Sequence, residues 1–188
     1  YDICACLVGS EMCIRDSWRS MYQLRGKLSI VMPAYNEEAL IYNSIMQTLS
    51  IVEQFAPDLE IIAVNDGSKD KTKQEIERAI RDDAKQPHPV VPGMRVSGTR
   101  IKLVTSNKNR GKGNAIISGI SQAEGDYIAF VDADLELNPA QLEGYLKKMQ
   151  ESGSDVVIGC KFHKDSELHY PFVRKVISLG YYMMLLVL

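Results

Sequence analysis

The sequence lacks the features that mark several common classes of protein. Its formal net charge is only −2, so it has no excess of positive charge of the kind that would favour nucleic acid as a partner. Its four cysteines form no CxxC pair and no zinc-ligand spacing, which favours a disulfide-independent fold in a reducing compartment. It contains neither GxxxxGK[ST] nor GxGxxG, so a P-loop NTPase and a Rossmann dehydrogenase are unsupported.

What the sequence does contain is a regular alternation of apolar runs and helical patterns from residue 28 onward. With 188 residues, 45% of them hydrophobic, the chain is long enough for one α/β domain with a sizeable core. The alternation predicts a doubly wound, mainly parallel sheet with helices on both faces. The expected strands are 28–32 (ended by Pro33), 59–64, 101–105, 127–131 and 155–160, and the expected helices are 37–55 (with Asn36 as N-cap), 71–84, 111–123 and 139–151.

The two ends of the chain do not follow this alternation. Residues 1–26 show no clear periodicity, and we interpret them as an artefact or a disordered segment, with a real extension as the alternative. Residues 27–165 form the expected domain. Residues 166–188 finish on an apolar run, which we expect to be the truncated start of a membrane-interface helix. The alternative is a core helix that packs on the sheet.

The most informative stretch is the apolar strand 127–131, which is followed by Asp132 and Asp134. We expect this strand to be covered on both faces. Side chains two residues apart in an extended chain point the same way, and two such carboxylates repel each other unless a cation lies between them. Mg²⁺ or Mn²⁺, bound by these carboxylates and by substrate phosphates, would supply that cation. The alternative is an acidic turn ahead of the helix that begins near Pro139.

Three more polar clusters follow predicted strands, at residues 33–37, 65–68 and 107–114. Because ligands of doubly wound sheets bind at the carboxyl ends of the strands, we expect all four clusters to form one site. Each cluster alone also fits an ordinary turn or helix start.

Individual side chains in these clusters have plausible roles in such a site. Tyr35 can stack on a planar base, and Asn65 or Asp66 can hydrogen-bond a base edge. Lys112 and its neighbour Arg110 can neutralise phosphates at a helix N-terminus, although a solvated helix start is an equally good interpretation.

A second set of polar residues lies near the C-terminus. Lys161 follows the fifth expected strand, and Arg174 and Ser178 are four residues apart, so they would share one face of a helix. Such a face could hold a phosphate whose tail lies in lipid. The alternative is a helix whose basic side chains extend toward the surface of a membrane or a core.

Together these motifs resemble the inverting family 2 glycosyltransferases of GT-A fold, from residue 28 to the C-terminus. Within that family the chain is most similar to the dolichyl- and polyprenyl-phosphate hexose synthases, on the evidence of residues 159–161 and 170–178. The matching family motifs are LSIVMPAYNEE (28–38), VNDGSKDKT (64–72), NRGKGNA (109–115) and DAD (132–134).

The resemblance implies transfer of a hexose from a GDP- or UDP-sugar to a polyprenyl phosphate, with inversion, at the cytoplasmic face of a membrane. Asp134, Lys161 and Arg174 would be the catalytic residues. The implied site residues are Pro33, Tyr35, Glu37, Asn65, Asp66, Lys112 and Asp132 for the nucleotide sugar; Asp132, Asp134 and Glu136 for Mg²⁺ or Mn²⁺; and Lys161, Arg174 and Ser178 for the acceptor phosphate.

The chain departs from the family pattern at three of these positions. Asn65 replaces a common Asp, Glu136 replaces Gln, and Lys161 replaces an Arg and so loses bidentate geometry while it keeps the charge. Two other functions remain open: a family 2 transferase with a polysaccharide or glycolipid hydroxyl as acceptor, and a non-catalytic nucleotide-sugar-binding scaffold at a membrane.

Overall fold

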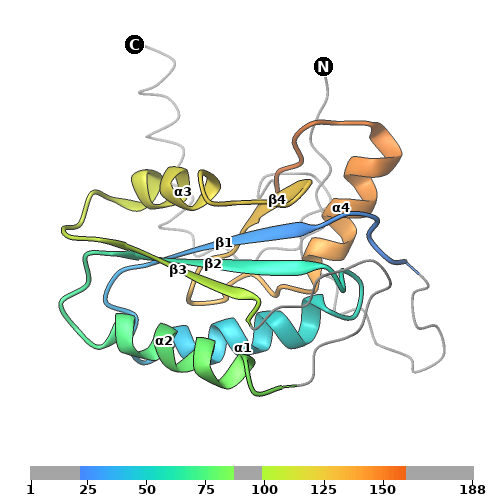
Figure 1. Cartoon of the computed structure of the whole chain (residues 1–188). Helices are drawn as coiled ribbons and strands as arrows, with labels where there is room; N and C mark the ends of the chain where they lie inside the picture. Colours follow the sequence, from blue (N-terminus) through green and yellow to red (C-terminus); the bar gives the residue numbers. More distant parts are fainter. Residues whose placement is uncertain (1–21, 87–98, 160–188) are drawn as a thin grey trace, which may run out of the picture. The chain divides into compact units, whose positions relative to one another are not determined.

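The computed structural model describes residues 22–86 and 99–159 (Figure 1). The chain divides into two compact units, and the fold below is that of the unit Trp18–Lys147. Predictions for residues 1–21, 87–98 and 160–188, among them the C-terminal helix and the roles of Lys161, Arg174 and Ser178, lie outside the described residues. The predicted boundaries at residues 27 and 165 stay predictions.

A four-stranded sheet forms the centre of this unit, with strand order β3-β2-β1-β4. Every neighbouring pair of strands is parallel, which confirms the predicted α/β class. The strands are β1 (Leu28–Ala34), β2 (Leu59–Asp66), β3 (Ile101–Ser106) and β4 (Tyr127–Phe130).

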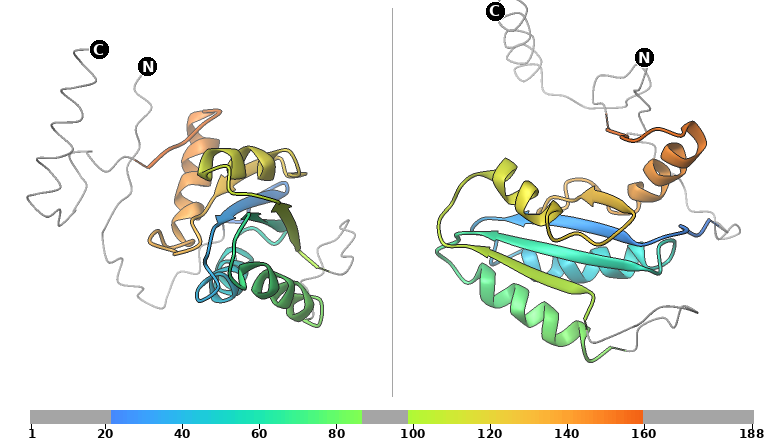
Figure 2. Two further views of the ribbon diagram at one scale, coloured as in Figure 1. Left: turned by 90° about the vertical axis from the view of Figure 1, so that its left-hand side faces the viewer. Right: turned by 45° about the horizontal axis from the view of Figure 1, so that its top comes forward.

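Helices lie on both faces of this sheet. Helices α1 (Ile41–Val52) and α2 (Thr72–Asp83) cover one face, and α3 (Lys112–Ile120) lies on the other (Figures 1 and 2). Helix α4 (Gln141–Ser152) follows β4 and continues into the second unit. Among the described residues, no helix is both long enough and apolar enough to cross a membrane.

The hydrophobic core has two parts because alternate strand residues face opposite sides of the sheet. The larger cluster, under α1 and α2, includes Ile30, Ile45 and Ile61, all fully buried. The smaller cluster joins Val31 and its neighbours to α3. Helix α3 lies very close to the sheet there, since a Cβ added at Gly119 would be 2.4 Å from Val31 Cγ1. This packing holds α3 against the sheet.

Strand β1 runs through Pro33, so the prediction that Pro33 ends this strand was wrong. The carbonyl of Val31 accepts a hydrogen bond from Val131, and alternate residues of a strand face the same neighbour. The nitrogen of Pro33 therefore faces the β4 side, where the ladder between β1 and β4 has already ended at Val31. The missing N–H thus costs no ladder bond.

Three further predictions about local structure were wrong. Strand β4 is not covered on both faces, since Ile128 and Phe130 are 41% and 57% exposed. Asn36 does not cap α1, because this helix begins at Ile41 and Leu40 occupies its N-cap position. Residues 155–159 are not in a strand, and Val156 and Ile158 are exposed. No described strand pairs with them, so their alternating pattern has no ladder to stabilise it.

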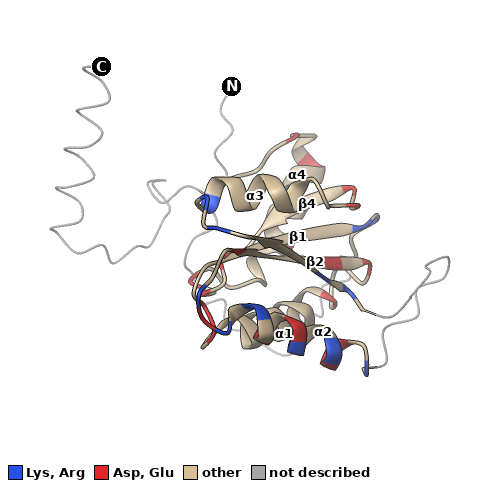
Figure 3. Cartoon of the chain, turned by 60° about the vertical axis from the view of Figure 1, so that its left-hand side comes forward, with Lys and Arg blue, Asp and Glu red and all other residues tan. Residues whose placement is uncertain are grey.

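Charged residues of both signs lie at the amino-terminal edge of the sheet (Figure 3), and several of their side chains form ion pairs. Glu60, only 4% exposed, lies between Lys27 and Lys102, whose ammonium nitrogens are 3.1 and 2.9 Å from Glu60 Oε2. Both lysines also pair with Glu124, at 3.0 and 2.6 Å. Ser29 Oγ donates to Glu60 Oε1 at 2.6 Å. Two carboxylates thus balance two ammonium groups.

The bonds around Glu60 change its acidity. Burial alone would raise the pKa of this carboxyl, but hydrogen bonds from Ser29, from the Glu124 amide and from the two lysines outweigh burial and lower the pKa from 4.5 to about 2. The fold therefore favours the ionised form of Glu60 strongly.

Candidate active site

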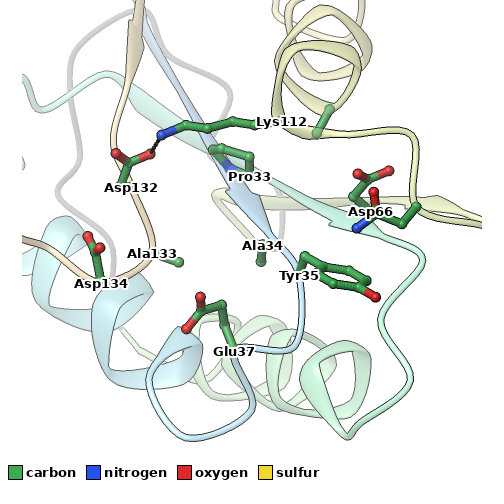
Figure 4. Close-up of a pocket in the computed structure, with 11 residues that line it drawn as sticks. Pro33, Ala34, Tyr35, Glu37, Asp66, Lys112, Asp132, Ala133 and Asp134 are labelled. Atoms are coloured by element: carbon green, nitrogen blue, oxygen red, sulfur yellow. Dashed lines mark ion pairs between the residues drawn. The ribbon is translucent and has the colours of Figure 1, made fainter. Parts of the chain in front are cut away.

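A pocket of about 320 Å³ lies at the carboxyl-terminal edge of the sheet, between the loops that follow the strands (Figure 4). Its lining includes residues from four separate segments, as the clustering of polar motifs predicted. Of the nine predicted site residues that lie in the described part of the chain, seven line the pocket: Pro33, Tyr35, Glu37, Asp66, Lys112, Asp132 and Asp134. Asn65 and Glu136 do not.

Hydrogen bonds tie the loop after β1 to the loop after β2. The Asn36 amide donates to Ser68 Oγ at 3.0 Å, and the Asn36 carboxamide oxygen accepts from the amide of Lys69 at 2.9 Å. The amide of Glu37 donates to Thr72 Oγ1 at 2.8 Å. These bonds hold Asn36 at φ 58°, a left-handed conformation that Asn tolerates better than most residues. They fix the backbone on both sides of Asn36 and so position Tyr35 and Glu37.

Asp66, at the end of β2, connects the second loop to the third. The residue is 2% exposed, and its carboxylate accepts hydrogen bonds from the amide of Arg110, at 3.0 and 3.1 Å, and from that of Gly111, at 2.8 Å. The approach is close, because a Cβ at Gly67 would be 2.4 Å from the carbonyl carbon of Lys108. Asp66 therefore anchors the loop before α3, a role that the sequence did not reveal.

Asn65 is buried, with 3% of its surface exposed. Its side-chain oxygen accepts a hydrogen bond from the amide of Ser68 at 3.1 Å. This bond, from an amide three residues further along the chain, shapes the loop after β2. The structure therefore does not bring Asn65 to the pocket.

Buried and exposed residues alternate in the chain after β4. Val131 and Ala133 are buried, whereas Asp132 and Asp134 are exposed and line the pocket. Ala133 and Asp134 form a turn, which the Leu135 amide closes by donating to the Asp132 carbonyl at 3.1 Å. Both carboxylates line the pocket, but the prediction that an extended chain points them the same way was wrong, because a turn brings them there.

Glu136 lies in the turn that follows. Its amide donates to Asp134 Oδ1 at 3.1 Å, but its side chain does not line the pocket. In the described part of the chain, no group of three His, Cys, Asp or Glu side chains gathers as a metal cluster. The structure thus brings Asp132 and Asp134 to one place without the third predicted ligand.

Lys112 reaches across the pocket to Asp132, and its Nζ is 2.7 Å from Asp132 Oδ1 (Figure 4). It is the first residue of α3. Both partners remain accessible, with side chains 62% and 49% exposed. Such a pair contributes little to stability and can open easily.

The pocket is rich in negative charge, since Glu37, Asp66, Asp132 and Asp134 face Lys112 as the one basic residue in its lining. The carboxylate oxygens of these four residues suit a hard divalent cation. Two carboxylates suffice for Mg²⁺ or Mn²⁺ when substrate phosphates and water complete the coordination shell. The residues present therefore fit a metal that arrives with a diphosphate.

Comparison with known proteins agrees with this arrangement. Residues 29–184 match the family described as glycosyl transferase family 2. The undecaprenyl-phosphate 4-deoxy-4-formamido-L-arabinose transferase of Photorhabdus laumondii is 33% identical over 152 residues, 81% of this chain and 42% of that protein. The enzyme of the same name from Enterobacter sp. is 35% identical over 131 residues, 70% of this chain and 36% of that protein. The chain thus spans about two fifths of the length of these relatives.

Solved structures show the same fold. The mannosyltransferase PcManGT from Pyrobaculum calidifontis, in complex with GDP-Man and Mn²⁺, has a TM-score of 0.54 and 22% identity, over 72% of this chain and 36% of that one. TarS 1–349 of S. aureus has a TM-score of 0.51 and 26% identity, over 69% of this chain and 34% of that one. The GT-A fold, the four motifs at one sheet edge and the family match over most of the chain lead to one conclusion: this protein belongs to glycosyl transferase family 2.

Proposed function

We propose that this protein transfers a sugar, expected to be a hexose, from a nucleoside-diphosphate sugar to a polyprenyl phosphate, with inversion at the anomeric carbon. The observation that carries the proposal is the pair Asp132 and Asp134, which shares a pocket with Tyr35 and Asp66. We expect the end of the pocket at Tyr35 and Asp66 to bind the nucleoside, and the end at Asp132 and Asp134 to bind the diphosphate. The named relatives act on undecaprenyl phosphate, which supports the choice of acceptor.

Tyr35 and Asp66 would bind the nucleoside. The Tyr35 side chain is 41% exposed and borders the pocket, so its ring can stack on a base. The Asp66 carboxylate already accepts three amide contacts, from Arg110 and Gly111. Each carboxylate oxygen has more than one acceptor site, so one site remains to accept a hydrogen bond from a base or ribose.

Asp132, Asp134 and Lys112 would bind the diphosphate. The two carboxylates would hold Mg²⁺ or Mn²⁺, which neutralises charge that develops on the leaving nucleoside diphosphate. Lys112 and the first-turn amides of α3 would face the phosphate oxygens, because such amides have no acceptor within the helix. These groups orient the donor so that its anomeric carbon faces the acceptor.

The acceptor needs no general base from the protein. A phosphate monoester has a second pKa of about 6 and is mostly dianionic at pH 7, so it is already a nucleophile. The phosphate oxygen forms the new bond to the anomeric carbon as the bond to the diphosphate breaks. Lys161, Arg174 and Ser178 remain predicted ligands of that phosphate, and attachment to the cytoplasmic face of a membrane remains a prediction as well.

A transfer assay tests this function. Undecaprenyl phosphate and undecaprenol, in detergent, are each incubated with the protein, Mn²⁺ and radiolabelled GDP-mannose, UDP-glucose or UDP-N-acetylglucosamine. The proposal predicts labelled lipid from at least one donor with the phosphate only, and none after EDTA treatment. Transfer to the free hydroxyl, or nucleotide-sugar binding without transfer to either lipid, would contradict it and favour the hydroxyl-acceptor transferase or the scaffold, respectively.

A further inference from the structure

The 2.7 Å ion pair between Lys112 and Asp132 has a consequence for metal binding. Asp132 is a predicted metal ligand, yet its Oδ1 already faces a cation, the Lys112 ammonium. Within the described lining of the pocket, four carboxylates surround this single basic side chain. An ammonium group and a metal ion cannot occupy the same position on one carboxylate oxygen.

We propose that Lys112 is a positioning residue that competes with the metal for Asp132 and then moves to the diphosphate of the donor. Before the ligands bind, Lys112 is the counter-ion of Asp132. When the metal and the nucleotide arrive together, the metal takes the carboxylate and the ammonium turns to the phosphates. This inference rests on the proposed function, since it assigns the exchange to the same site.

The geometry of the pair suits an exchange. Both side chains are about half exposed, and an exposed ion pair is weak enough to be broken by a divalent cation. Glu60, by contrast, is a buried carboxylate that lies between two lysines. The Asp132 carboxylate in the pocket lacks this burial.

The surroundings of Lys112 offer its ammonium a second partner. Lys112 opens the nine-residue helix α3, and Gly111 before it has φ 91°. The amides of a first helical turn have no acceptor within the helix, and a Cβ at Gly113 would meet nothing within 4 Å. A phosphate beside this turn would therefore find both open space and positive charge. The Lys112 side chain can reach it by rotating away from Asp132.

The exchange would couple the two ligands. Lys112 opposes a metal that arrives alone, because the metal must displace the ammonium and leave it without a partner. Lys112 favours a metal that arrives with a diphosphate, because the displaced ammonium gains the phosphates. Metal and nucleotide should thus bind more tightly together than separately, and the coupling must be reciprocal.

Lys112→Met separates these two effects because it should change them in opposite directions. Free Mn²⁺ is followed by electron paramagnetic resonance during titration of the 188-residue chain, first alone and then with saturating Mn²⁺ and increasing UDP or GDP. Without nucleotide, Lys112→Met should bind Mn²⁺ about threefold more tightly, as expected when an exposed ion pair is removed. With Mn²⁺ present, the variant should bind the nucleoside diphosphate about tenfold more weakly, since a hydrogen bond to a charged group is lost.

Lys108→Met is the matched control. It removes the same charge from the loop just before α3, but Lys108 does not line the pocket, so both affinities should stay within about twofold of those of the unchanged protein. A Lys112→Met protein with unchanged affinities, or with both affinities shifted in the same direction, overturns the inference. Failure of the proposed function gives a different result: the transfer assay then yields no labelled polyprenyl phosphate, while the titrations with Mn²⁺ and with nucleotide still report the exchange at Asp132.

Discussion

The two edges of the sheet differ in how completely their charged side chains are paired. At the amino-terminal edge, Lys27 and Lys102 pair with Glu60 and Glu124, so positive and negative groups balance within this cluster. At the carboxyl-terminal edge, the pocket lining has four carboxylates and one ammonium. The first arrangement is complete without a ligand, whereas the second leaves an excess of negative charge around an open space.

This difference separates groups that stabilise the fold from groups that serve a ligand. Buried charges that are paired and hydrogen-bonded hold strands together, but carboxylates that are exposed and only partly neutralised repel one another. Such repulsion is tolerated where a cation relieves it. The contrast predicts that substitutions at the pocket affect activity with little effect on stability, and that substitutions at the opposite edge do the reverse.

The largest effect should come from the pocket. Asp134→Ala removes one carboxylate of the predicted metal site, and we expect sugar transfer to fall about a thousandfold, in the range seen when a preorganised electrostatic group is lost. Initial rates at saturating Mn²⁺ measure this loss. The control is Glu136→Ala in the same turn, which should cost less than about threefold if this side chain stays outside the pocket. Comparable losses in the two variants would restore Glu136 as a third ligand.

The next largest effect should come from the amino-terminal edge. Glu60→Gln leaves Lys27 and Lys102 without their buried partner, and we expect the free energy of unfolding to fall by about 3 kcal/mol. Urea unfolding at pH 7 measures it. The exposed partner of Lys73, Glu77, provides the control, since Glu77→Gln should cost less than about 0.5 kcal/mol.

The same substitution predicts a dependence on pH. The pKa of Glu60 is lowered from 4.5 to about 2 in the fold, so its stabilisation is fully present above pH 4.5 and is lost as the pH falls toward 2. The difference in stability between the unchanged protein and Glu60→Gln should shrink over that window. A difference that stays constant down to pH 2 would mean that the charge of Glu60 contributes nothing.

The smallest effect should come from Gly67, where the loops after β2 and β3 meet. Gly67→Ala places a Cβ 2.4 Å from Lys108 at φ 69°, so we expect a loss of about 2 kcal/mol and weaker nucleotide binding as Asp66 loses its amide partners. Thermal unfolding and nucleotide titration measure both. Gly113→Ala is the control for the thermal unfolding alone, because its Cβ meets nothing within 4 Å and Ala suits a helix better than Gly. Equal destabilisation in both variants would contradict the close approach.

The sequence predicted those parts of the structure that depend on local pattern. Strongly apolar runs located all four described strands, and the polar motifs that follow those strands indicated that Asp132 and Asp134 line one pocket. The sequence did not predict contacts between distant segments of the chain. Asn36 looked like a helix cap because its partners, Ser68 and Lys69, lie in another loop.

The other features that the sequence did not predict also depend on contacts between distant segments. Asp66 could not be recognised as an anchor, because Arg110 and Gly111 are more than forty residues away. The extent of β1 past Pro33 depended on where β4 stops, and local sequence carries no information about that. The ion pair of Lys112 with Asp132 likewise exists only because two loops meet.

The measurement that most directly tests the proposed site is calorimetric binding of UDP and GDP with Mn²⁺ or with EDTA, to the unchanged chain and to the variant with Asp132→Asn and Asp134→Asn. The site predicts that at least one nucleotide binds the unchanged chain in Mn²⁺ and that EDTA or the double substitution weakens this binding at least about tenfold. Binding that is equally tight in EDTA, or in the double variant, would contradict a metal–diphosphate site at the carboxyl-terminal edge.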